Sequence, residues 1–320
     1  MELSVIIPAK NEEKYFSKCL EYLDRARQSW GGKAELILVD NGSTDSTKLI
    51  AEGYGCRIIE QPNGTISKLR NLGAKTAMGD ILAFLDADCL VASNWISCCI
   101  QNFANPNIAI VGTRAIPDFK TASWVEKAWF KLVPGSERPD FVNWLGTSNL
   151  FIRKDVFFVV GGFDEKLETG EDVNLCYKIA RKHLIYLEKR IDTIHLRESK
   201  TLIELFRREY WRGKNSIKSF VENNFARKEL LSVAVPAANL ISVAISLMSG
   251  IMRSSYAIIT IIAALSFPAL LMVRKRLKID ASTEIIRCYI VAFVYISARS
   301  CSLASELFHF FMSLTCRGLK

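Results

Sequence analysis

Short strand-like and helical segments alternate over the first two-thirds of the chain. Four runs rich in apolar residues have the length of buried strands: residues 3–7, 36–39, 56–59 and 81–85. Three segments between them place apolar residues at helical spacing: 13–29, 46–54 and 67–78. This order predicts an α/β fold with a mixed, mostly parallel sheet and helices on both faces. Ligands of such sheets bind at the carboxyl ends of the strands, so chemistry is expected just after each strand.

A different pattern begins near residue 230. From there to residue 273 the only charged side chain is Arg253. The runs 230–249 and 254–273 each approach the ~20 apolar residues that a bilayer-crossing helix requires. Pro236 and Pro268 lie inside these runs, and membrane helices tolerate proline better than soluble ones do. We therefore predict a transmembrane hairpin.

The last segment, 284–314, has a mixed character. Its polar residues fall on about a third of the helical circumference: Arg287, Arg299, Ser302, Ser305, Glu306 and His309. This pattern predicts an amphipathic helix at the membrane interface or a third spanning helix with its polar stripe inward. The chain then divides into a domain of residues 1–220 and a membrane-anchoring region of residues 221–320.

Charge is distributed unevenly along the chain. The formal net charge is +9, yet residues 1–196 hold 24 basic and 25 acidic side chains, whereas residues 197–320 hold 18 and 8. Basic residues flank the hairpin on both sides, which places both flanks on the cytoplasmic side. We expect the inner, cytoplasmic membrane, with the N-terminal domain on its cytoplasmic side and membrane lipids as partners. Because the excess charge brackets apolar runs, we expect no nucleic-acid partner.

Polar clusters follow several of the predicted strands. Asp86 and Asp88, separated by one residue, directly follow the apolar run ILAFL. Two like charges at a strand end repel each other, and a divalent cation relieves that repulsion. Oxygen ligands of this kind suit Mg²⁺ or Mn²⁺, which often bind substrate phosphates as well. The pair is therefore a candidate metal site.

Four further residues each have a chemical and a purely structural interpretation. Asp40 ends a strand, where its carboxylate can accept hydrogen bonds from a ligand or form a turn. Arg70 can pair with a diphosphate or lie on an exposed helix face. Asp172 can act as a general base or favour a helix N-terminus. His195 can bind a metal or be a polar core residue.

The clusters together resemble a known family. The order PAKNEE, VDNGSTD, RNLGA, FLDAD, GTSNLFIRKDVFFVVGGFDE, GED and IH, over residues 1–220, is similar to the family 2 glycosyltransferases of GT-A (Rossmann-like) fold. The resemblance implies which residues line the nucleotide pocket: Pro8, Ala9, Asn11, Glu12, Asp40 and Ser43. In this family Asp40 would read the base, and we expect uridine.

The resemblance also implies roles around the sugar. Arg70 would face the nucleotide diphosphate, and Asp86 would hold the ribose or the metal. Asp88 would coordinate the metal, and His195 is similar in place to a histidine that contacts metal or phosphate. Asp172 would be the catalytic base.

Two more features bear on the acceptor. Residues 207–213 read RREYWRG, so the QxxRW signature of processive members is absent and a single transfer is expected. Trp144 and Asn149 lie in the segment that resembles the acceptor side of the family.

The resulting hypothesis is an inverting, metal-dependent transfer from a nucleoside diphosphate sugar to a hydroxyl of a lipid-linked or membrane-presented glycan. Three alternatives remain: transfer to polyprenyl phosphate itself, a nucleotidyltransferase, and a non-catalytic membrane scaffold. A nucleotidyltransferase would carry a Gly-rich loop after the first strand, where this chain has PAKNEE. A scaffold would bind the donor without turnover.

Overall fold

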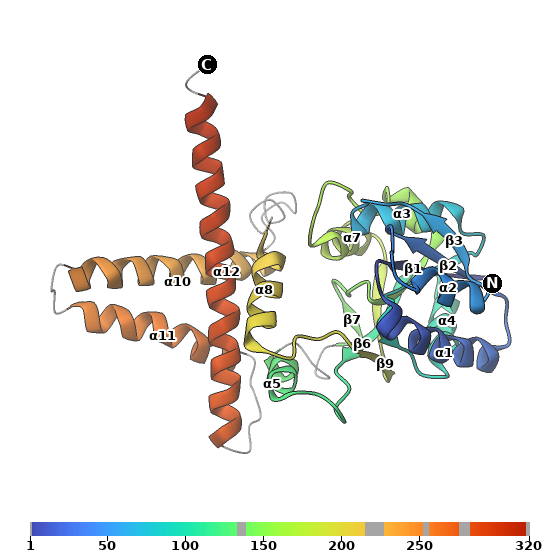
Figure 1. Ribbon diagram of the computed structural model, residues 1–320, viewed down its shortest axis with the longest axis horizontal. Coiled ribbons are helices and arrows are strands. Elements are labelled where there is room, and N and C mark those ends of the chain that lie inside the picture. Colours follow the sequence, from blue (N-terminus) through green and yellow to red (C-terminus); the bar gives the residue numbers. More distant parts are fainter. Residues whose placement is uncertain (1, 133–138, 215–226, 252–255, 275–281, 318–320) are drawn as a thin grey trace. The chain divides into compact units, whose positions relative to one another are not determined.

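The structure is a computed structural model that describes residues 2–132, 139–214, 227–251, 256–274 and 282–317. The chain forms two compact units, one from residues 1–118 and 135–198 and the other from residues 119–134 and 199–320 (Figure 1). This partition differs from a single boundary at residue 220. The reason is that helices α5 (Trp124–Leu132) and α8 (Leu202–Gly213) pack on the long C-terminal helix α12 (Ser282–Arg317).

The first unit is built on one sheet, whose strands in the described residues run β3-β2-β1-β4-β8-β6-β9-β5, with β7 paired to β9. Strands β1 (Leu3–Ala9), β2 (Ala34–Asp40), β3 (Arg57–Glu60) and β4 (Ile81–Leu85) are parallel, as predicted. Strand β8 (Asn149–Arg153) is antiparallel to both β4 and β6 (Ile108–Ile116). Strand β9 (Leu184–His195) is parallel to β6 and antiparallel to the two-residue strands β5 (Cys89–Leu90) and β7 (Phe141–Val142).

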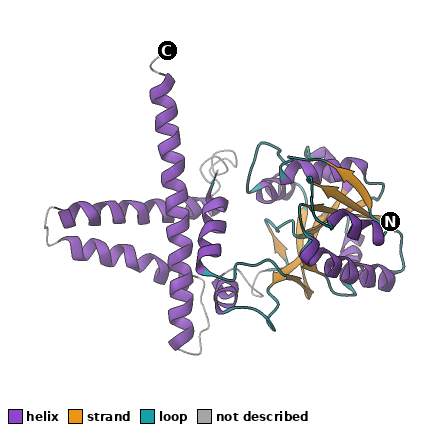
Figure 2. Ribbon diagram, in the orientation of Figure 1, coloured by secondary structure: helices purple, strands orange, loops and turns teal. Residues whose placement is uncertain are grey.

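Alternation along the strands divides the core between the two faces of this sheet. In β1, Val5 and Ile7 point to one face and Ile6 to the other. Helices α1 (Glu13–Trp30), α2 (Thr47–Gly53) and α4 (Trp95–Ile100) cover the first face. Helices α3 (Ile66–Thr76), α6 (Lys154–Val159) and α7 (Glu171–Ala180) cover the second (Figure 2).

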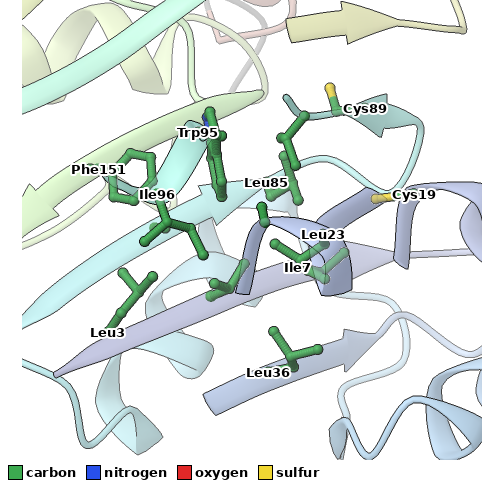
Figure 3. Packing of buried hydrophobic residues seen from close by; sticks show 14 of the residues in the cluster. Leu3, Ile7, Cys19, Leu23, Leu36, Leu85, Cys89, Trp95, Ile96 and Phe151 are labelled. Carbon is green, nitrogen blue, oxygen red and sulfur yellow. The ribbon is translucent and has the colours of Figure 1, made fainter. Parts of the chain in front are cut away.

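The first face shows why these segments become helices and strands. Helix α1 buries Phe16, Leu20 and Leu23, which recur on one side of the helix. Leu23 packs beside Ile7 of the sheet (Figure 3). Each such side chain contributes about 1.5–3 kcal/mol when fully buried. The predicted amphipathic pattern therefore acts through burial against the sheet.

On the second face α3 lies very close to β1. A β-carbon added at Gly73 would come within 2.4 Å of the Ile6 Cγ2 atom. Glycine permits this close approach, and it holds the preceding turn of α3, with Arg70 and Asn71, at the carboxyl end of the sheet.

The second unit is helical. Helices α10 (Arg227–Ile251) and α11 (Tyr256–Arg274) pack on each other and on α12. Among the described residues, Val233–Ile251 and Ser282–Phe308 are long and apolar enough to cross a membrane, and α11 contains a shorter apolar stretch, Ala264–Val273. His309, one of the residues of the predicted polar stripe, has a side chain that the structure does not describe.

Candidate active site

The loops after β1 and β2 are joined by hydrogen bonds. The Asn11 amide donates to Ser43 Oγ at 3.0 Å, and the Thr44 amide donates to Asn11 Oδ1 at 2.8 Å. The Glu12 amide donates to Thr47 Oγ1 at 2.8 Å. Asn11 has a φ of 54°, a left-handed backbone that asparagine tolerates. The register of β1 on β2 places Pro8 beside Val39 and Ala9 beside Asp40. All six residues predicted for the nucleotide pocket therefore lie together.

Asp40 combines a structural contact with an unpaired acceptor. The residue is buried, and its Oδ2 accepts hydrogen bonds from the amides of Gly42 and Ser43 at 3.0 and 2.9 Å. Its Oδ1 has no partner among the described residues. Leaving such a group without a partner costs about 1–3 kcal/mol, so this oxygen is suited to accept a hydrogen bond from a ligand.

The carboxyl end of β4 meets the end of β9. His195 pairs with Cys89 across β5 and β9, which brings His195 Nε2 within 3.4 Å of Asp88 Oδ1. On the other side of the ring, His195 Nδ1 lies 2.9 Å from Glu198 Oε1. A carboxylate on the second nitrogen is the arrangement that orients metal-binding histidines. The two residues predicted to bind metal are therefore neighbours, with the Cys89 thiol close by.

The electrostatics of this cluster favour a cation. Burial raises the pKa of Asp88, and the nearby Asp86 charge raises it further, against the opposing effect of His195. Burial also raises the pKa of Glu12. The charge of Arg197 opposes this increase, and the charges of Asp88 and Asp86 add to it. For His195, burial lowers the pKa, but the hydrogen bond to Glu198 and the Asp88 charge outweigh it and raise the pKa overall. A carboxylate oxygen and an imidazole nitrogen in this setting fit Mn²⁺ or Mg²⁺.

Arg70 lies deeper than an exposed helix face. Its side chain is 4% exposed, with Nη1 donating to Glu171 Oε1 at 2.8 Å and Nη2 donating to Asp86 Oδ1 at 3.0 Å. The guanidinium thus connects the start of α7 to the end of β4. It orients Asp86 and draws the Glu171–Asp172 pair toward the site.

Asp172 stands in the first turn of α7, after Gly170 with a φ of 80°. Its Oδ1 accepts a hydrogen bond from the Val173 amide at 2.7 Å. A β-carbon added at Gly146 would lie 3.7 Å from Asp172 Oδ2, so the acceptor-side segment passes this carboxylate closely. The Asp172 charge also contributes to the raised pKa of Arg70, in which burial is outweighed by the carboxylates around the guanidinium.

Two residues of the site are absent from the sequence-based candidates: Arg197 and Glu198. Glu171 belongs to the motif GED, but no role was expected for it. Arg197 forms an ion pair with Glu12, and its side chain is 61% exposed. A signal for Glu198 was available, because it follows His195 by three residues. Asn149, expected near the acceptor, is buried in β8, and its Oδ1 accepts from the Thr113 amide at 2.9 Å. Its contact with the acceptor stays a prediction.

Comparison with known proteins agrees with this geometry. Residues 4–156 match the model of glycosyl transferase family 2. The glycosyltransferase AglE of Haloferax volcanii is 28% identical over 242 residues, 73% of this chain and 79% of AglE. The glucosyl-dolichyl phosphate glucuronosyltransferase of the same organism is 25% identical over 240 residues, 67% of this chain and 75% of that protein.

A solved structure shares the fold. The mannosyltransferase PcManGT from Pyrobaculum calidifontis, determined in complex with GDP-Man and Mn²⁺, superposes with a TM-score of 0.64 at 17% identity, covering 93% of this chain and 86% of PcManGT. The predicted fold class and the predicted enzyme class are confirmed. The chain carries a glycosyl transferase family 2 domain of GT-A fold and is a glycosyltransferase that uses nucleotide-sugar donors.

Proposed function

We propose that this enzyme transfers one sugar, with inversion, from a nucleoside diphosphate sugar to a hydroxyl of a lipid-linked or membrane-presented glycan. The observation that carries the proposal is the meeting of three different acidic sites at one edge of the sheet. These are the unpaired buried oxygen of Asp40, the Asp88–His195 pair, and Asp172 beside Gly146. In that order, these sites would contact the nucleobase, the diphosphate and the acceptor hydroxyl.

Asp88 and His195 would hold a divalent metal, Mn²⁺ or Mg²⁺, with Glu198 orienting the imidazole. When bound, such an ion supplies positive charge to the departing diphosphate. The fit rests on the two ligand atoms, 3.4 Å apart, and on the raised pKa values of the carboxylates around them. The Mn²⁺ of the PcManGT complex, a protein of the same fold, supports the same assignment.

Arg197 is our candidate for direct contact with the donor diphosphate. Both terminal nitrogens of Arg70 already donate to carboxylates, so Arg70 has its main role in positioning Asp86. Arg197 instead sits at the exposed rim, paired with Glu12. A guanidinium there can exchange that carboxylate for phosphate oxygens as the donor enters.

Asp172 would accept the proton of the acceptor hydroxyl as that oxygen attacks the anomeric carbon. Its first-turn position on α7 leaves the carboxylate half-buried and beside the Gly146 segment. Arg70 lies between this base and Asp86, which keeps base and metal ligands separate. The base, a positioned donor and electrostatic help to the leaving group together make an in-line displacement with inversion.

A lipid-linked acceptor has two supports. The chain contains long apolar helices next to its catalytic unit in sequence, and one relative is named as acting on a glucosyl-dolichyl phosphate. We place the enzyme at the inner membrane with its catalytic unit on the cytoplasmic side, on the basic flanks of the hairpin.

The test begins with a panel of nucleoside diphosphate sugars, with and without Mn²⁺, measured by thermal stabilisation of the purified full-length protein. The stabilising donor is then incubated with lipid extracts and, separately, with polyprenyl phosphate. We expect metal-dependent stabilisation and transfer to a glycolipid. Transfer to polyprenyl phosphate alone would replace the proposed acceptor, and donor binding without any transfer would contradict the proposed reaction.

A further inference from the structure

Helix α10 changes its surroundings halfway along. Pro236 and Asn239 are buried, whereas from residue 241 onward apolar side chains are exposed. Leu247 and Ile251, for example, are 65% and 83% exposed. The side chains from 242 to 249 that remain half-buried are serines and lie along one strip. The outer half of α10 therefore presents apolar side chains over most of its circumference.

Helix α11 is exposed along most of its described length. Ile258, Ile259, Ile261 and Ile262 are exposed in its outer part, and Leu270 and Val273 are 59% and 75% exposed farther along, beyond the buried Pro268. Apolar exposure around the outer halves of two packed helices has no counterpart in a soluble core. It fits hydrocarbon, which surrounds a helix without competing for hydrogen bonds.

Helix α12 crosses this hairpin (Figure 1). Tyr289 Oη donates to the Leu265 carbonyl of α11 at 2.6 Å. Asn239 Nδ2 of α10 donates to Ser300 Oγ at 3.0 Å, and that hydroxyl donates to the Pro236 carbonyl at 3.0 Å. Tyr289 and Ser300 are about 16 Å apart along α12, from a rise of 1.5 Å per residue. Helix α12 therefore contacts α11 at Tyr289 and α10 at Ser300, and so runs across the hairpin.

Helix α12 makes charged contacts at two places, on either side of the uncharged stretch 288–298. Near its start, Glu284 pairs with Lys131 of α5. Farther along, Arg299 pairs with Glu209 of α8 at 3.4 Å and donates to the Arg212 carbonyl at 2.8 Å. The predicted polar stripe is thus, at Arg299, packed inward against α8.

These contacts argue against α12 as a spanning helix, although its length and composition would allow one. From Glu284 to Arg299 is about 22 Å, most of the ~30 Å of hydrocarbon. If α12 crossed the bilayer, α5 and α8 would lie at that depth with their exposed charges, such as Lys127 and Arg207. Each such charge costs several kcal/mol within a bilayer.

The exposed face of α12 is suited to a membrane surface. Ile286, Phe293 and Phe308 are exposed, at spacings of seven and fifteen residues that keep them close to one line along the helix. A single apolar line with polar contacts on another side is typical of a helix in the interfacial plane.

We propose that the α10–α11 hairpin spans the bilayer and that α12 lies along the surface of the leaflet the hairpin enters. Ile286, Phe293 and Phe308 then face acyl chains. The inference rests on the membrane association proposed above and adds its topology: two crossings, with both termini on one side.

The lengths agree with this arrangement. From residue 230 to Ile251 is about 32 Å of helix, against ~30 Å of hydrocarbon. The crossing with α12, at Pro236 and Asn239, falls about 9–13 Å from the start of that length. Interfacial helices lie at a similar depth, ~5–10 Å. In the sequence, the one charged residue between residues 230 and 273 is Arg253, which follows Ile251 by two positions.

The test uses the full-length chain in a bacterial inner membrane. A fluorescent protein that matures only in the cytoplasm, and alkaline phosphatase, which is active only after export, are fused in turn to each terminus. An epitope inserted after Arg253 or, in a second variant, after Lys278 is then probed with antibody in spheroplasts and in inverted vesicles. None of these readouts depends on glycosyl transfer, so they are independent of the proposed reaction.

We expect fluorescence and no phosphatase activity at both termini, an epitope after Arg253 accessible only in spheroplasts, and an epitope after Lys278 accessible only in inverted vesicles. Active phosphatase at the C-terminus alone would mean that α12 crosses and would overturn the proposal. With both termini in the cytoplasm, an epitope after Arg253 accessible only in inverted vesicles would mean that the hairpin does not cross. An epitope after Lys278 accessible only in spheroplasts would mean that α12, and not α11, makes the second crossing, and would overturn the proposal. Should the insertion prevent membrane integration, the terminal fusions still decide whether the number of crossings is even. Phosphatase activity at both termini would keep two crossings and contradict only the cytoplasmic orientation.

Discussion

At the scale of single residues, Asp172 is the proposed base, and Asp172→Asn tests it. The amide cannot accept the proton, so turnover should fall by about 10²–10⁴-fold while donor affinity stays the same. Single-turnover kinetics and donor titration separate the two quantities. Asp155→Asn is a matched control, because Asp155 opens α6 and accepts from the following amide at 2.8 Å in the same way. Lost donor affinity in Asp172→Asn would contradict the assignment.

Glu198 tests the metal site through a residue that does not itself touch the ion. Its carboxylate lies 2.9 Å from His195 Nδ1, so Glu198→Gln should loosen the orientation of the imidazole. Such changes lower metal affinity by about 10–100-fold. Titration with Mn²⁺, followed by electron paramagnetic resonance, measures this. Glu60→Gln removes an exposed carboxylate of β3 that pairs with Lys48 and should have no effect. Equal affinities in the two variants would exclude Glu198 from the site.

Arg197 tests how the donor diphosphate is held. Arg197→Ala should weaken inhibition by a nucleoside diphosphate about 10–100-fold, from the ~1.5–3 kcal/mol of a hydrogen bond to a charged group. Inhibition by the monophosphate should change much less. Arg25→Ala, which breaks an exposed ion pair with Glu21 on α1, serves as the control. If the variant weakened both inhibitors alike, Arg197 would have no specific contact with the second phosphate.

Most of the residues found from sequence lie at the end of a strand or shortly after it. Asp40 ends β2, and Asp88 follows the end of β4 by three positions. Arg197 was not found from sequence, because its partner Glu12 is 185 positions away in the chain and no local pattern encodes their meeting. The ion pairs of the Arg70 guanidinium could not be predicted from sequence either, because they depend on how Glu171 of α7 packs against the end of β4.

At the scale of elements, the approach of α3 to β1 determines where Arg70 lies. Gly73→Ala would place a methyl group 2.4 Å from Ile6 Cγ2 and should destabilise the protein by about 1–3 kcal/mol. In a unit of this size that corresponds to several degrees in Tm. Gly53→Ala at the end of α2 has no atom within 4 Å and should leave Tm unchanged or slightly higher. Thermal unfolding by circular dichroism compares the two, and an unchanged Tm in Gly73→Ala would contradict the close packing.

The parallel strands β1–β4 were predictable, whereas the long strands β6 and β9 and the two-residue strands were not. The four parallel strands carry apolar runs that burial on both faces requires. Strands β5 and β7 have two residues each and exist only through pairing with β9. Residues 207–213, which read RREYWRG, lie in helix α8, but this pattern does not say which hydrophobic core the helix joins. Its buried Leu205 packs against α12 rather than the sheet.

At the scale of the whole molecule, the uneven charge has a physical interpretation. The nearly neutral N-terminal part contains the sheet and the acidic site. The basic C-terminal part contains the apolar helices, whose exposed side chains would contact hydrocarbon in the proposed arrangement. A membrane-bound acceptor would be brought to the enzyme by this part. The residues of the active site still determine which substrates the enzyme uses.

The central claim is inverting, metal-dependent transfer with Asp172 as the base, and the anomeric configuration of the product tests it most directly. The stabilising α-linked donor is incubated with acceptor and Mn²⁺, and the new linkage is determined by nuclear magnetic resonance. We predict a β-linked product, formed only with divalent metal and not by Asp172→Asn. An α-linked product, or an undiminished rate in Asp172→Asn, would contradict the account.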